Sequence, residues 1–184
     1  MNKYFKIGFG LVALTATGYF IYKLLNKRKI SSKGISFITD LEGKRNYAYR
    51  DSKGLWTTGV GHLIKPNEEF LKTKVLSNEE INNLLRKDLS KFESVVNDSI
   101  DVPLKQHEFD SLVSIAFNIG ENAFPKSTFV KLINEGKGKE EIKKSIAQWK
   151  KPIDIIGRRA KEIRLFDNGL YSNQIATREL TYFI

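Results

Sequence analysis

The stretch "LEGKRNYAYRDSKGLWTTGVGHL", residues 41–63, decides the fold class, because the periodicity of the chain changes within it. Leading into this stretch, Ile35, Ile38 and Leu41 are spaced three residues apart, which places them on one face of a short helix. Gly43 suits the left-handed conformation in which many helices end. The sequence therefore predicts a short helix that is followed directly by a segment of another kind.

The rest of the stretch has the pattern of a β-hairpin. Tyr47 and Tyr49 alternate with smaller or polar residues, and residues 55–60 are rich in types that favour strands. Between these two runs, the sequence DSKG at 51–54 supplies Asp and Gly, which are typical of tight turns. We therefore expect a small β-containing lobe here.

After the hairpin the periodicity becomes helical. Ser77 and Glu80 form a capping-box pattern ahead of a long helix, which we expect at residues 78–97. The apolar stretch QHEFDSLVSIAFNIG, residues 106–120, should form a central buried helix. Further helices are expected at residues 127–135, 139–149 and 156–166. The predicted fold class is α+β, with a small β-containing lobe and a larger helical lobe.

Composition limits the kinds of site that the chain can hold. Of its 184 residues 41% are hydrophobic, which is enough for the packed core of one domain. The absence of cysteine excludes disulfides, thiolate nucleophiles and cysteine-ligated zinc. His62 and His107 are the only histidines, too few for a metal site built from histidine. We therefore expect neither a metal nor a cofactor.

The net charge of +10 is concentrated at the amino terminus. Residues 1–34 contain seven Lys or Arg residues and no Asp or Glu, which leaves only +3 for residues 35–184. A nucleic-acid-binding domain would show a basic stripe or a recognisable motif in its folded body, and this sequence shows neither. The charge instead flanks an apolar segment, so it indicates a membrane as partner and no nucleic acid.

That apolar segment, residues 7–25, contains a single charged residue, Lys23. Its 19 positions approach the roughly 20 residues that a helix needs to span a bilayer. We expect residues 1–25 to be a transmembrane or signal-anchor segment with basic flanks. A cleavable signal peptide is disfavoured because no small-x-small cleavage site follows, and a core helix because the segment is apolar on every face. Residues 26–34 indicate a polar linker, and residues 35–184 the folded domain.

The hairpin stretch also holds three residues whose combination suits the cleavage of a glycosidic bond. This cleavage needs an acid that protonates the leaving oxygen and a second carboxylate that activates water or attacks the sugar. Glu42 at a helix end and Asp51 in a turn offer two carboxylates in unequal surroundings, and the hydroxyl of Thr57 can hold a water. From spacing alone, Asp51 could equally cap a turn and Glu42 could be a solvated helix-end residue.

The motif EG-R---Y-D--G--T-G-GH resembles the phage-type lysozymes of glycoside hydrolase family 24. Eight residues separate Glu42 from Asp51 in it, and five separate Asp51 from Thr57. The similarity continues through FDSLVSIAFNIG, STFVKLIN and GRRAKEIRLF in the family's order, and it covers residues 35–167. The resemblance implies a lysozyme-like fold, in which a long helix joins a small β-hairpin lobe to a larger helical lobe.

The resemblance also implies roles for single residues. Glu42 would be the general acid, and Asp51 and Thr57 would position or activate a water. The family's contacts to sugar would fall on Leu63, Phe117 and Ser127. By their residue types alone, Phe117 also fits a core position and Ser127 a helix cap. A cleft asparagine of some members is replaced by Lys143 here, which puts that contact in doubt.

Three further residues of these motifs have structural interpretations. The resemblance gives His62 a hydrogen-bonding role in the fold, in preference to the role of a base. Arg158 and Arg159 are interpreted either as surface ion pairs or as anchors between parts of the molecule, and only third as ligands of substrate carboxylates.

The function implied is that of an endolysin. Such a muramidase hydrolyses the β-1,4 linkage between N-acetylmuramic acid and N-acetylglucosamine in bacterial peptidoglycan, and this leads to lysis of the host cell. One alternative is a membrane-tethered, non-catalytic module that binds peptidoglycan, but Glu42 and Asp51 are both present. Another is a lytic transglycosylase, which needs no water-holding aspartate. We expect a monomer whose partners are peptidoglycan and, through residues 7–25, the membrane.

The expected location is the host inner membrane, with the catalytic domain on the periplasmic or cell-wall side, because a muramidase must reach peptidoglycan. The distribution of charge disagrees. Two lysines precede the apolar segment, whereas five basic residues occur within residues 23–33, and the positive-inside rule would keep that side in the cytoplasm. The alternative is a cytoplasmic protein that awaits release through a holin.

Overall fold

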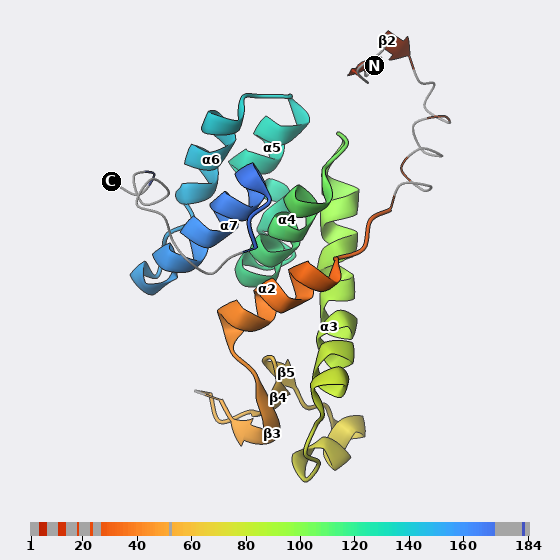
Figure 1. Ribbon diagram of the computed structural model, residues 1–184, viewed down its shortest axis with the longest axis vertical. Helices are drawn as coiled ribbons and strands as arrows, with labels where there is room; N and C mark the ends of the chain where they lie inside the picture. The colour runs from red at the N-terminus through yellow and green to blue at the C-terminus, as the bar shows by residue number, and fades with distance from the viewer. Residues whose placement is uncertain are drawn as a thin grey trace.

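A computed structural model describes residues 4–6, 11–13, 18, 23, 27–51, 53–171 and 182, and it shows two lobes joined by one long helix (Figure 1). The smaller lobe contains the strands β3 (Arg45–Arg50), β4 (Trp56–Gly59) and β5 (His62–Leu63) and the 3-10 helix η1 (Pro66–Lys72). The long helix α3 (Asn78–Ser99) extends from this lobe along the helical lobe (Figure 1). Helix α2 (Ser32–Glu42) lies across α3 and leads into the strands.

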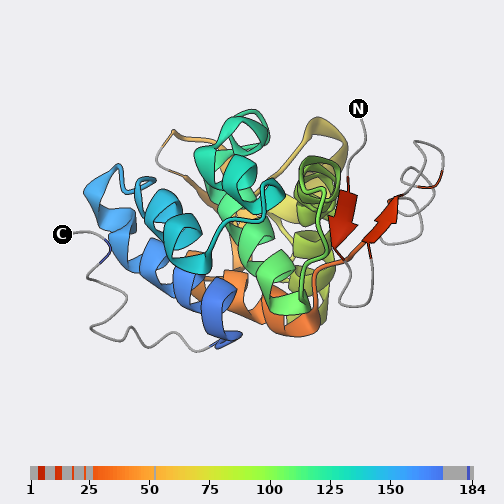
Figure 2. The same cartoon turned by 90° about the horizontal axis from the view of Figure 1, so that it is seen from above.

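The larger lobe is built around α4 (Gln106–Ile119), which packs against α3 and against α7 (Ile156–Asn168). Phe109, Leu112 and Ile115 of α4 are at most 1% exposed. The lobe is completed by η2 (Phe124–Lys126), α5 (Thr128–Asn134), α6 (Lys139–Ala147) and η3 (Ile153–Ile155). Helices α6 and α7 lie on the side of the lobe away from α3 (Figure 2). The central buried helix predicted from the sequence is confirmed.

Helix α2 begins earlier than the sequence predicts. Ser31 caps it, because its Oγ accepts a hydrogen bond from the N–H of Gly34 at 3.0 Å. Ile30, one residue earlier, is 3% exposed and belongs to the core. The structure therefore places the start of the folded region within residues 26–34, the stretch predicted as a linker. The sequence misplaced this boundary because Ser31 and Gly34 are residue types that are common in linkers. In the structure Ser31 caps the helix and Gly34 makes a close packing contact.

The three strands form one antiparallel sheet in the order β3-β4-β5. In the turn between the first two, the N–H of Gly54 donates to the carbonyl of Asp51 at 2.9 Å. Gly54 has a φ of 76°, a conformation that glycine adopts without steric cost. The strand register sets Thr57 of β4 between Tyr49 of β3 and Leu63 of β5. The predicted hairpin is confirmed, and β5 brings Leu63 beside Thr57.

The long helix α3 starts at the predicted capping box. The N–H of Glu80 donates to Ser77 Oγ at 3.2 Å, and the N–H of Ser77 donates to Glu80 Oε2 at 2.8 Å. The helix continues to Ser99, slightly beyond the predicted end at residue 97. Its buried side chains face both lobes, so α3 is a rigid connection between them.

The amino-terminal region contains two short described strands, β1 (Tyr4–Lys6) and β2 (Leu11–Ala13), which pair antiparallel. Strand β2 falls within residues 7–25, for which the sequence predicts a membrane helix. Apart from β2, Gly18 and Lys23, that segment lies outside the described residues. Among the residues that are described, none of the helices combines the length and the apolar character needed to cross a bilayer.

Candidate active site

Glu42 is the last residue of α2, and a guanidinium from the far end of the chain holds its side chain. Arg158 Nη1 on α7 donates to Glu42 Oε1 at 2.5 Å, and the Glu42 side chain is 29% exposed. A charge-assisted hydrogen bond of this length fixes the two side chains relative to each other. The structure therefore places Glu42 at the helix end, as predicted, beside the cation Arg158.

Arg158 is itself fixed by the helical lobe. Its Nε donates to Glu162 Oε1 at 3.0 Å, and its Nη2 donates to the carbonyl of Ser114 at 3.5 Å. Burial alone would lower the pKa of Arg158, but the charges of Glu162 and Glu42 outweigh it and the pKa is raised. Arg159, which is fully buried, also pairs with Glu162. Both arginines are therefore anchors, in agreement with one of the two structural interpretations of the closing motif.

Asp51 fixes the turn between β3 and β4 through one of its two side-chain oxygens. Its Oδ1 accepts hydrogen bonds from the N–H of Lys53 at 2.9 Å and from the N–H of Leu55 at 2.8 Å. Within the described part of the chain, both hydrogen bonds to this carboxylate end at Oδ1. The turn-capping interpretation is therefore right, and it leaves Oδ2 available for a further ligand.

Thr57 is connected to Asp51 through a single intervening residue. Its Oγ1 donates to the carbonyl of Leu55 at 3.3 Å, and the N–H of the same Leu55 donates to Asp51. Thr57 is 4% exposed, so its hydroxyl is held in a fixed direction on β4. Asp51 and Thr57 thus each hydrogen-bond to the backbone of Leu55, and the joint role that their spacing in the motif suggests stays a prediction.

Two of the predicted sugar contacts line one groove between the lobes. The groove has a volume of about 460 Å³. We call it the lysine groove, and its lining residues are Gly61, His62, Leu63, Lys65, Lys87, Asp88, Ser90, Lys91, Phe92 and Phe117. Leu63 is 48% exposed, and the ring of Phe117 meets that of Phe92 edge to face at 5.3 Å between centroids. Phe117 is therefore not only a core residue, because it also lines the groove.

Ser127 and Lys143 are placed differently. Ser127 is 5% exposed, its Oγ donates to the carbonyl of Phe124 at 2.7 Å, and it does not line the lysine groove. Its contact with sugar stays a prediction. Lys143 is 4% exposed and pairs with Asp167 at 2.8 Å and with Glu140 at 2.6 Å. Burial would lower the pKa of Lys143, but these carboxylates raise it, so Lys143 joins α6 to α7 as a structural cation.

His62 forms the centre of a charged triad that the sequence did not reveal. Its Nδ1 lies 2.8 Å from Asp88 Oδ2, and its Nε2 lies 2.9 Å from Glu68 Oε2. Because ionised carboxylates only accept hydrogen bonds, both ring nitrogens donate, which is the state of the imidazolium. The hydrogen bond to Asp88 raises the pKa of His62, burial opposes it, and the hydrogen bond to Glu68 adds to it. The structural role implied for His62 therefore fits the geometry.

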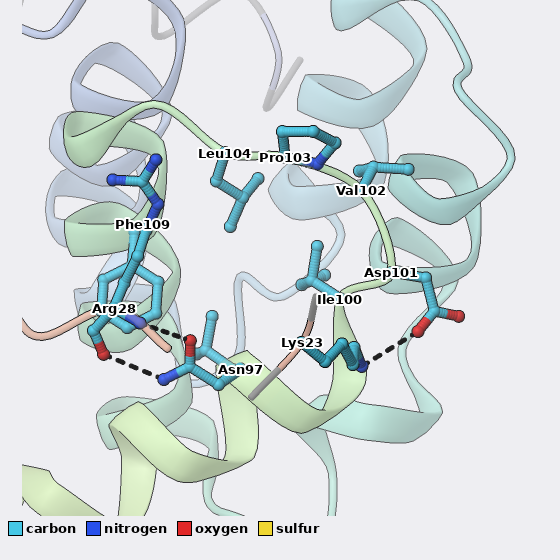
Figure 3. A pocket seen from close by; sticks show the side chains of 10 residues that line it. Lys23, Arg28, Asn97, Ile100, Asp101, Val102, Pro103, Leu104 and Phe109 are labelled. Carbon is cyan, nitrogen blue, oxygen red and sulfur yellow. Dashed lines mark hydrogen bonds and ion pairs between the residues drawn. The ribbon is translucent and has the colours of Figure 1, made fainter. Parts of the chain in front are cut away.

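A second hollow lies at the end of α3, and none of the candidate site residues lines it (Figure 3). Asn97 exchanges two hydrogen bonds with the backbone of Arg28, both at 2.9 Å, and Lys23 reaches Asp101 at 3.0 Å. Its volume of about 60 Å³ is much smaller than that of the lysine groove. This hollow is therefore part of the attachment of the chain that precedes α2.

The sequence of residues 39–162 matches the family model described as phage lysozyme. The chain belongs to the phage lysozyme family. It is 36% identical to the endolysin of Salmonella phage P22 over 143 residues, which cover 75% of this chain and 97% of that protein. A crystal structure of a mutant P22 lysozyme is similar to this fold, with a TM-score of 0.71, 34% identity and coverage of 76% of this chain and 98% of that one.

The chain is also similar to a protein named SAR-endolysin, from Haemophilus phage HP1. The two are 32% identical over 95 residues, which cover 51% of this chain and 49% of that protein. Together these similarities confirm the resemblance to phage-type lysozymes, the lysozyme-like α+β fold and the degradation of peptidoglycan as the function.

Proposed function

We propose that this phage lysozyme is a hydrolase that cleaves the β-1,4 linkage between N-acetylmuramic acid and N-acetylglucosamine. The observation that carries the proposal is the joining of Asp51 and Thr57 through Leu55, with Asp51 Oδ2 available. A carboxylate and a hydroxyl in fixed positions can hold a water between them and orient it for attack on the sugar. A transglycosylase has no use for such a water, so the arrangement favours hydrolysis.

Glu42 is the acid of the proposed reaction. In the structure its carboxyl group is paired with Arg158. As the general acid, Glu42 would donate a proton to the glycosidic oxygen of the bound substrate. Arg158 would hold the side chain in position between turnovers and stabilise the carboxylate that forms after proton transfer.

The proposal is tested by digesting purified sacculi and identifying the new chain ends by mass spectrometry. Hydrolysis leaves reducing ends, whereas transglycosylation leaves anhydro-muramic ends. Glu42→Gln keeps the shape of the side chain but removes the transferable proton, so the rate should fall by about 100-fold or more. Asp40→Asn, a change at an exposed carboxylate two residues earlier on the same helix, should leave the rate unchanged. Anhydro ends, or near wild-type activity in folded Glu42→Gln, would contradict the assignment.

We further propose that residues 7–25 act as a signal-anchor that carries the folded domain to the outer face of the host inner membrane. The apolar stretch with basic flanks supports this location, and so does the similarity to a SAR-endolysin. The retained alternative is a cytoplasmic protein that is released when a holin opens the membrane.

A further inference from the structure

We propose that the lysine groove binds the carboxylates of the peptide stems that peptidoglycan carries on its muramic acid residues, an inference that rests on the proposed muramidase activity. Lys65, Lys87 and Lys91 would bind these carboxylates. Leu63 and Phe117 would contact the glycan itself.

The lysine groove adjoins the candidate catalytic residues on both of its sides. Leu63 on β5 is the register partner of Thr57 on β4, so one wall of the groove begins at the neighbouring strand position. Phe117 lies on α4 one helical turn from Ser114, whose carbonyl accepts a hydrogen bond from Arg158, the partner of Glu42. A glycan strand bound for cleavage would therefore extend into this groove.

The charges that the groove presents to solvent are positive. Lys87 and Lys91 have side chains that are 66% and 59% exposed. Lys87 lies 3.4 Å from Glu68, and Lys91 lies 3.7 Å from Glu121 and 4.8 Å from the centroid of the Phe92 ring. The carboxylates of Glu68 and Asp88 at the groove are less accessible to solvent. Both are hydrogen-bonded to His62, and their side chains are only 9% and 24% exposed. A ligand would therefore meet ammonium groups before it met carboxylates.

The spacing of the lysines suits a ligand with more than one carboxylate. Lys87 and Lys91 are four residues apart on α3, so they rise from the same face about 6 Å apart, and Lys65 follows β5 on the facing lobe. In peptidoglycan that carries stems, the lactyl carboxyl group of muramic acid is joined to the peptide as an amide, so the negative charges lie on the stem and not on the sugar rings. A peptide stem carries several carboxylates and hangs from the glycan that the apolar residues contact.

The inference is tested with the full chain, in which Lys87→Gln and Lys91→Gln are combined. The control combines Lys131→Gln and Lys144→Gln, which remove the same charge from exposed positions on α5 and α6. Each protein is assayed on three forms of peptidoglycan: native sacculi, sacculi whose carboxylates have been amidated with carbodiimide and ammonia, and sacculi stripped of phosphodiester polymers with hydrofluoric acid. Sedimentation with the sacculi measures binding, and release of reducing ends measures turnover.

We expect the groove variant to bind native sacculi about fivefold more weakly than wild type at low salt, because exposed ion pairs contribute modestly and are screened. Amidation should weaken wild-type binding similarly and abolish the difference between the two proteins. An equal loss in the control variant, or a difference that survives amidation, would overturn the inference. So would a difference that disappears with the phosphodiester polymers instead. If no protein releases reducing ends, the muramidase proposal fails, and the binding measurements still decide the role of the groove.

Discussion

At the scale of single residues, the two side-chain oxygens of Asp51 separate folding from chemistry. Asp51→Asn keeps an oxygen that can accept from the N–H groups of Lys53 and Leu55, so we expect the free energy of unfolding to change by less than about 1 kcal/mol. The change removes the charge that would activate water, so turnover should fall about 100-fold or more. Urea unfolding, sedimentation with sacculi and a turbidity assay measure the three properties. If folding or binding were lost together with turnover, the role of Asp51 would be limited to stabilising the turn.

At the residue scale, the sequence could suggest which residues act together only where the motif is local. Glu42, Asp51 and Thr57 lie within one continuous stretch, so their spacing alone could suggest that they act together. The partner of Glu42 could not be found this way, because Arg158 is 116 residues distant in sequence. Glu68 and Asp88 gave no signal either, since each looks like an ordinary surface acid until His62 is placed between them.

At the scale of elements, the start of α2 depends on close packing at Gly34. A Cβ at this position would lie 2.7 Å from Asp110 Cγ and 2.7 Å from Ile30 Cγ1. Asp110 cannot easily move, because it accepts hydrogen bonds from the N–H of Ser31 at 3.0 Å and from the hydroxyl of Tyr171 at 2.6 Å. We therefore expect Gly34→Ala to lower the free energy of unfolding by about 1–3 kcal/mol despite the better helix propensity of alanine.

The matched control for this prediction is Gly138→Ala. Gly138 has a φ of −63°, and within the described part of the chain no atom beyond its sequence neighbours lies within 4 Å of the position that a Cβ would occupy. The change should therefore cost only about 0.5 kcal/mol, because alanine is a poorer N-cap than glycine. Thermal and urea unfolding compare the two variants. Equal effects would mean that Asp110 gives way and that the contact at Gly34 is not tight.

The triad of His62, Glu68 and Asp88 joins β5, η1 and α3, and it should make stability depend on pH. The raised pKa of His62 means that its contribution is complete below about 6.5 and is lost as pH rises through the folded-state pKa. Burial would raise the pKa of Glu68, but the hydrogen bond from His62 and that from the N–H of Lys65 lower it from 4.5 to about 2. The contribution of Glu68 is therefore present above 4.5 and is lost as pH falls towards 2.

These two directions define a window between pH 4.5 and 6.5 in which the triad stabilises the fold most. We expect His62→Gln to lower the free energy of unfolding by about 3 kcal/mol in this window, because it leaves two carboxylates without their cation. The loss should shrink as pH rises above the folded-state pKa of His62. Urea unfolding at pH 5.5, 7 and 8.5 measures it, with His107→Gln as the control. A loss that is the same at all three pH values would show that packing and not charge accounts for the effect.

The order and type of the elements could be predicted more fully than their ends. Hydrophobic spacing located α3, α4 and the hairpin because each buries a regular face. The start of α2 was placed too late because the contacts of Ile30 and Ser31 are made with α3 and α4, which lie more than sixty residues further along the chain.

At the scale of the whole molecule, the residues before α2 are attached to the helical lobe by side chains. The N–H of Ile30 donates to Glu93 at 2.8 Å, and the side chain of Asn97 exchanges two hydrogen bonds with Arg28. Only two residues separate Leu25 from Arg28, so the extended chain between these two residues reaches about 10 Å. If residues 7–25 enter a bilayer, the end of α3 that carries Asn97 must therefore lie near the membrane surface.

The function of the folded domain and the charge around the apolar segment predict different locations for the domain. Five basic residues lie within residues 23–33, at the carboxyl end of the apolar segment and after it, and by the positive-inside rule they favour retention of the domain in the cytoplasm. We expect the domain to be exported, because peptidoglycan lies outside the membrane, and protease added to spheroplasts should digest it.

Two double variants that remove positive charge test whether the positive-inside rule controls the location of the domain. Lys27→Gln combined with Lys29→Gln removes positive charge after the segment, so the exported fraction should increase by the same rule that opposes export in the wild type. Lys3→Gln combined with Lys6→Gln removes charge before the segment and should decrease it. The full chain is expressed without a holin, and protease accessibility is measured together with lysis. Protection of the wild-type domain in intact spheroplasts, without lysis, would mean that charge prevails and that the enzyme waits in the cytoplasm.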